Sequence, residues 1–127
     1  MTDAYPTAGA ELPATDPSAL DRLKKFGGRK LLGEMIALFL ATAPERIDAA
    51  RAAGARGDVD GAERALHSLR SSAAQLGAMR LQRLSEQGEY RARAGSLDGL
   101  TRLADDLERE LARVREWLVK ARDEGAA

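Results

Sequence analysis

The side chain best suited to chemistry in this 127-residue chain is its single histidine, His67. It lies in the stretch LHSLRSSAAQLGA, residues 66–78, in which small serine and alanine side chains are frequent. A free histidine, with a reference pKa of about 6.5, is mostly unprotonated at neutral pH and can then act as a nucleophile. The candidate chemistry is therefore nucleophilic attack by an imidazole whose small neighbours let another molecule approach.

The pattern around His67 predicts a helix that turns this residue away from the core. Apolar residues recur at spacings of three and four, at Ala62, Leu66, Leu69, Ala73 and Leu76. On a helical wheel of roughly 100° per residue, His67 lies about 140° from the centre of that stripe. A solvent-facing histidine on a helix is more often an ordinary surface residue than a functional one, so this geometry alone assigns no role.

The flank of the predicted helix that follows His67 is nearly flat. Ser71 lies one turn after the imidazole and Ala74 two turns after it. Arg70, three residues after His67, can hold an anion beside the ring. The pattern indicates an imidazole that another protein can reach and that can carry negative charge.

The N-terminal half predicts a short helix followed by a long one. Asp16 and Pro17 form a helix start, and the short helix carries Leu20, Leu23 and Phe26 before it stops at Gly27-Gly28. The long helix begins near Arg29 and ends near residues 54–57. Pro44 favours a bend within this helix, although a second reading begins a new helix with Thr42 as its cap.

The C-terminal half predicts three more helices. Asp58 or Asp60 caps the first, which carries His67 and ends at Gly77. The next covers residues 79–94, and Ser96 is the predicted cap of the last. The last helix has a long apolar seam: Leu100, Leu103, Leu107, Leu111, Val114 and Leu118.

These elements predict an all-α fold, an antiparallel four-helix bundle with a short additional N-terminal helix. No segment alternates with a period of two, which argues against strands. We expect residues 1–15 to form a disordered tail, residues 16–123 the bundle domain, and residues 124–127 a flexible C-terminus.

The composition excludes several classes of function. The 20 basic and 20 acidic residues cancel, which argues against a general nucleic-acid binder. There is no cysteine, and one histidine is a poor metal-ligand set, so no metal site is predicted. The longest apolar run, residues 35–41, is too short to span a membrane. We see no signal peptide and no nucleotide-binding loop, and therefore expect a cytoplasmic protein that is not an autonomous enzyme.

The stretch around His67 resembles the signature of histidine-containing phosphotransfer (HPt) domains of two-component signalling. Residues 66–72 stand in the first part of that signature, and the leucine-glycine-alanine of residues 76–78 stands in the second. Further matches are Asp58, Phe39-Leu40, Leu81, Leu84 and Glu89. The resemblance covers about residues 18 to 120.

The resemblance implies a phosphocarrier with His67 as the phospho-acceptor. Such domains take a phosphoryl group from an aspartate of a receiver domain and pass it to another receiver. The implied partner is a response-regulator receiver domain, a hybrid sensor histidine kinase, or both. Mg²⁺ belongs to the receiver, and this chain needs no cofactor. We expect a monomer that binds neither nucleic acid nor membrane.

The resemblance also assigns roles to the neighbours of His67. Arg70 stands in place of a lysine that neutralises the phosphoryl charge, and Ser71 stands in place of a glycine that lets the receiver approach. The expected receiver-docking residues are Arg64, Ser71, Ala74, Gln75 and Leu40. Leu31 and Leu38 are further docking candidates, with contact to the short first helix as the alternative.

Two other readings stay open. Because Arg70 and Ser71 both depart from the family pattern, the chain could be a degenerate member that binds a receiver or kinase without transferring phosphate. Alternatively, the leucine seam of the last helix could pair with another chain in a helical dimerisation module. Phosphorylation of His67 distinguishes the relay from the non-transferring member. A leucine seam that packs within one chain distinguishes it from the dimerisation module.

Overall fold

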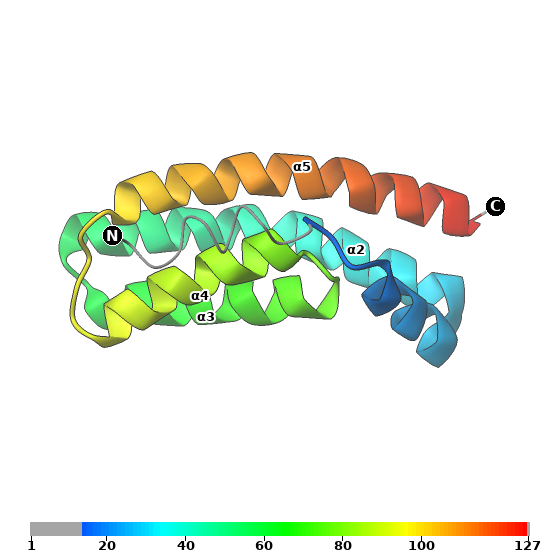
Figure 1. The fold of residues 1–127 in the computed structure, drawn as a ribbon, viewed down its shortest axis with the longest axis horizontal. Helices are drawn as coiled ribbons and strands as arrows, with labels where there is room; N and C mark the ends of the chain where they lie inside the picture. The colour runs from blue at the N-terminus through cyan, green and yellow to red at the C-terminus, as the bar shows by residue number, and fades with distance from the viewer. Residues whose placement is uncertain (1–13, 127) are drawn as a thin grey trace.

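The computed structural model describes residues 14–126, and in this part of the chain helices are the only regular secondary structure. They are α2 (Pro17–Arg56), α3 (Val59–Gln75), α4 (Met79–Arg93) and α5 (Leu100–Ala126). Figure 1 shows them side by side along one axis, with α5 at the top of the view and α3 and α4 at the bottom. Both α3 and α5 pack against α2 and against α4, which confirms the predicted helical bundle.

Helix α2 contains the predicted short and long helices, joined at Gly28. The backbone of Gly28 leaves helical geometry with φ 75° and ψ −172°, a conformation that glycine adopts without steric strain. Asp16 caps the first segment by accepting a hydrogen bond from the Ser18 amide, as predicted. The helix continues through Pro44, so the reading with a new cap at Thr42 is wrong. The Thr42 hydroxyl instead donates to the Leu38 carbonyl within the helix.

The remaining helix ends agree with the sequence except at the two ends of α5. Asp58 caps α3 through a 2.9 Å hydrogen bond from the Gly61 amide. Ser96 does not cap α5. Its hydroxyl accepts a hydrogen bond from the Asp98 amide in the loop before the helix. The helix begins only after Gly99, whose φ of 74° interrupts any earlier helical start. At its other end α5 continues to Ala126, beyond the boundary expected at residue 123. The expected N-terminal tail, apart from residues 14 and 15, lies outside the described residues.

The core is formed by the predicted apolar faces, with one exception in the first segment of α2. Ala19 and Leu20 are buried and Leu23 is partly buried, but Phe26 is 88% exposed. Its prediction as part of the apolar stripe is wrong. In Figure 1 this segment extends past the end of α3 and α4 before the chain turns back at Gly28. Phe26, in the last turn of this segment, therefore points to solvent and not into the core.

The leucine seam of α5 is buried within the single chain. Its buried members are Leu100, Leu103, Leu107, Leu111, Val114 and Leu118. Since the seam packs against α2 and α4, it offers no free face to a second chain, and the dimerisation reading loses its main support. No helix in the described part of the chain has the length and apolar character needed to cross a membrane.

Candidate functional site

Helix α3 presents His67 on its outer face. Ala62, Leu66, Leu69 and Ala73 are buried against α2 and α4, so the opposite side of the helix faces solvent. The side chain of His67 is 54% exposed, which agrees with the orientation predicted from the spacing. Its ring is therefore open to another macromolecule.

The predicted docking residues of α3 share the face of His67. Arg64, Ser71, Ala74 and Gln75 are all exposed there. Leu40 lies on α2 and is partly buried against the core, and its role in docking stays a prediction.

The two further candidates on α2 differ from each other. Leu31 covers Gly27 of the first segment, as the alternative reading expected. Leu38 is an exposed side chain. Of the two, therefore, only Leu38 is left available for a partner.

A buried carboxylate that the site prediction missed stands directly beside the ring. Glu89 on α4 is 3% exposed, and its Oε2 lies 2.8 Å from Nδ1 of His67. Its Oε1 accepts a 2.6 Å hydrogen bond from Nε of Arg70. A signal existed in the sequence, since Glu89 falls four residues after Ser85 and three before Ala92, on the apolar stripe of its helix. A carboxylate at such a position needs partners.

The electrostatics of Glu89 fix the proton on His67. Burial alone would raise the pKa of Glu89, but hydrogen bonds from His67 and Arg70, together with the charge of Arg70, hold it below its ordinary value. The ionised carboxylate can only accept hydrogen bonds, so Nδ1 of the neutral ring carries the proton and donates it. Nη2 of Arg70 lies 3.1 Å from the same Nδ1. This is a close contact and not a hydrogen bond to the ring, because a protonated Nδ1 has no lone pair to accept one. The lone pair of His67 is therefore on Nε2.

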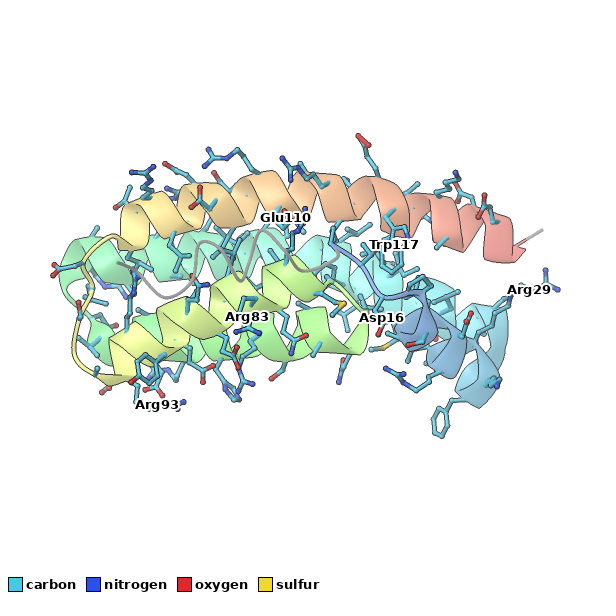
Figure 2. The ribbon with its side chains drawn as sticks, in the orientation of Figure 1. Asp16, Arg29, Arg83, Arg93, Glu110 and Trp117 are labelled. Atoms are coloured by element: carbon cyan, nitrogen blue, oxygen red, sulfur yellow. The ribbon has the colours of Figure 1, made fainter. Side chains whose placement is uncertain are left out.

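A second arginine completes the cluster. Arg93 on α4 donates to Oε2 of Glu89 at 2.7 Å and, through Nε, to Oε2 of Glu63 on α3 at 2.8 Å. The hydrogen bond to Glu63, with the charges of Glu63 and Glu89, raises the pKa of Arg93 further. Figure 2 shows Arg93 where α3 and α4 lie side by side. Two carboxylates and two guanidinium groups thus balance their charges around the imidazole.

Comparison with known proteins agrees with this arrangement. The sequence model of the Hpt domain matches residues 34–117, which include the whole cluster. The chain belongs to the Hpt domain family. It is therefore a phosphotransfer protein of two-component signalling, as its resemblance implied.

Two solved structures from the Hpt family share the fold. The chain is similar to histidine-containing phosphotransfer protein B from Pseudomonas aeruginosa PAO1, with 25% identity and a TM-score of 0.82 over 90% of this chain and 98% of that one. It is also similar in fold to the HPT domain of a sensor hybrid histidine kinase from Shewanella, with 18% identity and a TM-score of 0.72 over 90% and 97% of the two chains. No curated protein gives a significant match.

Proposed function

We propose that His67 is the phospho-acceptor of a relay between receiver-domain aspartates. The observation that carries this proposal is the pairing of an exposed imidazole with a buried carboxylate, Nδ1 of His67 lying 2.8 Å from Oε2 of Glu89. The carboxylate orients the ring and directs the Nε2 lone pair outward, where a partner protein can bring its phosphoryl group. Membership of the Hpt domain family supports the same role.

The proposed transfer is a displacement at phosphorus. The Nε2 lone pair attacks the phosphorus of an aspartyl phosphate, a nitrogen–phosphorus bond forms, and the phosphorus–oxygen bond to aspartate breaks. The aspartate leaves as a carboxylate with the bonding electron pair. The ring keeps its Nδ1 proton and gains positive charge, which Glu89 stabilises. In the return step a second receiver aspartate attacks the phosphorus and restores the neutral imidazole.

Arg70 is proposed to neutralise the transferred phosphoryl group. Its guanidinium lies within 3.1 Å of the His67 ring and is about one-third exposed, so it can turn toward an attached phosphoryl group. The planar fork of arginine suits phosphate oxygens. The Mg²⁺ and the acidic pocket of the reaction are proposed to belong to the receiver.

The proposed docking surface is the exposed face of α3. Ser71 and Ala74 are small enough for a receiver to approach the ring closely, and Arg64 and Gln75 offer polar contacts beside them. Since the leucine seam of α5 packs internally, we propose that the working unit is one chain. The partner is a response-regulator receiver domain, which can be part of a hybrid sensor histidine kinase.

The decisive experiment is phosphoryl transfer from a phosphorylated receiver domain to the wild-type chain and to His67→Gln. We expect label on the wild type, lost in acid and stable in alkali, and none on the variant. Since His67 is exposed, the variant should unfold at nearly the wild-type temperature, which circular dichroism checks. Receivers that bind the wild type but never transfer label would instead favour the non-transferring regulator to which the departures at Arg70 and Ser71 point.

A further inference from the structure

We infer that Arg93 is a positioning residue that holds Glu89 in place while Arg70 moves from Glu89 to the phosphoryl group. This inference rests on the proposed function of His67. It assigns different tasks to the two arginines that contact one buried carboxylate. Arg70 is the cation that moves, and Arg93 is the cation that stays.

The first argument is the burial of Glu89. Its carboxylate accepts from Arg70 on Oε1 and from both His67 and Arg93 on Oε2. Removing a charged partner from a buried carboxylate is strongly unfavourable. When Arg70 departs, Arg93 is the remaining guanidinium on this carboxylate among the contacts of the described residues. The move of Arg70 is therefore favourable only if Arg93 remains bound.

The second argument is the position of each arginine along α3. Arg70 follows His67 by three residues, whereas Glu63, which holds Arg93, precedes His67 by four. The two guanidinium groups thus approach Glu89 from opposite sides of the ring. Arg93 uses separate nitrogens to bind Glu89 and Glu63, on two different helices. Arg93 is thereby held by two carboxylates on two helices, whereas Arg70 is held by one carboxylate, although the Arg70 side chain is the less exposed of the two, at 31% against 61%.

The third argument is the charge of the product. The cluster is neutral before transfer, since Glu63 and Glu89 balance Arg70 and Arg93. A phosphoryl group adds about two negative charges at neutral pH. Arg93 cannot supply the compensating charge without leaving two carboxylates, one of them buried. Arg70 can supply it, provided that Arg93 still neutralises Glu89.

The test uses the full chain phosphorylated with phosphoramidate, so that receiver docking plays no part. Nε2 of His67 attacks the phosphorus, the phosphorus–nitrogen bond breaks, and the nitrogen leaves as ammonia after taking up a proton. The side-chain Nε–H signal of Arg70 is then followed by NMR before and after phosphorylation. In the wild type we expect a large shift of this signal as Arg70 leaves Glu89. In Arg93→Gln we expect almost none.

Three further variants separate positioning from folding. Arg93→Lys keeps the charge and should restore most of the Arg70 shift. Arg91→Gln removes an exposed arginine from the same helix and should behave like the wild type. Glu63→Gln weakens the attachment of Arg93 and should give an intermediate shift, even if Arg93→Gln folds poorly.

A second readout is the exchange equilibrium with one receiver domain. Arg93→Gln should lower the phosphohistidine fraction by about three- to tenfold, a modest factor because the Arg93 side chain is 61% exposed. Arg70→Gln should do the same, and the double variant should lose little more. A wild-type Arg70 shift in Arg93→Gln, or losses that simply multiply, would overturn the role of Arg93. If the wild type takes no phosphoryl group on His67, the proposed function fails, and this inference fails with it.

Discussion

The carboxylate of Glu89 on α4 accepts a hydrogen bond from Nδ1 of His67 on α3 at 2.8 Å. Glu89 is almost fully buried, whereas the side chain of His67 is 54% exposed. A carboxylate in that position fixes the ring orientation and the tautomer and faces the positive charge that develops on the ring. The imidazole thus receives its electrostatic support from the protein interior while its reactive nitrogen faces outward.

Replacing Glu89 by glutamine should slow transfer to His67 by about 10- to 100-fold. The amide keeps nearly the same shape but carries no charge, and a hydrogen bond to a charged group contributes about 1.5–3 kcal/mol. Rapid-quench measurement of label transfer from one phosphorylated receiver gives the rate. Glu86→Gln, an exposed change on the same helix, is the matched control. Transfer at the wild-type rate in Glu89→Gln would contradict the proposed role of the carboxylate.

Replacement of Arg70 should affect the stability of the phosphorylated state according to charge. Arg70→Gln should lower the fraction of phosphohistidine at equilibrium with a receiver by about tenfold, since one charge-assisted contact is lost. Arg70→Lys keeps the charge without the fork and should remain within about threefold of the wild type. Equal losses in both variants would show that the geometry of the guanidinium, rather than its charge, is what the site needs.

Ala74→Trp should block receiver docking without impairing the chemistry of His67. Ala74 is exposed two turns from the ring, so a large side chain there obstructs an approaching partner while leaving the core untouched. Calorimetric titration should show much weaker receiver binding, whereas phosphoramidate should still label His67. Ala112→Trp on the exposed side of α5 serves as the control. Unchanged receiver affinity in Ala74→Trp would place the docking surface elsewhere.

Glu110→Gln should stabilise the protein at neutral pH. Glu110 is buried on the side of α5 toward α4 (Figure 2), and its Oε2 has no hydrogen-bond partner within residues 14–126. Burial raises its pKa, although the charges of Arg113 and Arg80 oppose the shift. A group whose folded-state pKa is raised loses its contribution to stability as the pH rises through that value.

Urea unfolding at two pH values tests this expectation for Glu110. At pH 7 the variant should have the higher midpoint, because the wild type must bury a charge. The difference should shrink as the pH falls toward 4.5, the ordinary pKa of the group. A difference that is constant between these pH values would mean that the carboxyl of Glu110 does not titrate abnormally.

Gly88→Ala should destabilise the bundle by about 1 kcal/mol. A Cβ at this position would overlap Cδ2 of Leu103 and lie 2.8 Å from Cδ1 of Leu66, both in the core. Overpacking of this kind typically costs about 1–3 kcal/mol, which exceeds the roughly 1 kcal/mol gain in helix propensity. Gly33→Ala, in a roomier helical position, should be stabilising in the same urea experiment. Stabilisation by Gly88→Ala would show that α4 has room to move away from α3 and α5.

The sequence by itself determined the helices and the direction in which His67 points. Both depend on local rules: the spacing of Leu66 and Leu69 sets the buried face of α3, and the glycines at positions 28 and 77 adopt positive φ where the helices end. The exposure of Phe26 and the late start of α5 were not predictable in this way. The first depends on where the neighbouring helices end and the second on the positive φ of Gly99, and the periodicity of the apolar residues records neither.

Only the tertiary structure decided which groups surround the imidazole. Glu89 follows His67 by 22 residues, and its pairing depends on the rotation and axial register of α4 against α3. Those quantities are set by packing: Gly88, without a side chain, lets Leu66 and Leu103 pack directly against the backbone of α4. The next residue is thereby brought beside the ring. Side-chain contacts between helices follow from the shape of the whole core, because each helix can rotate or slide until its neighbours are in place.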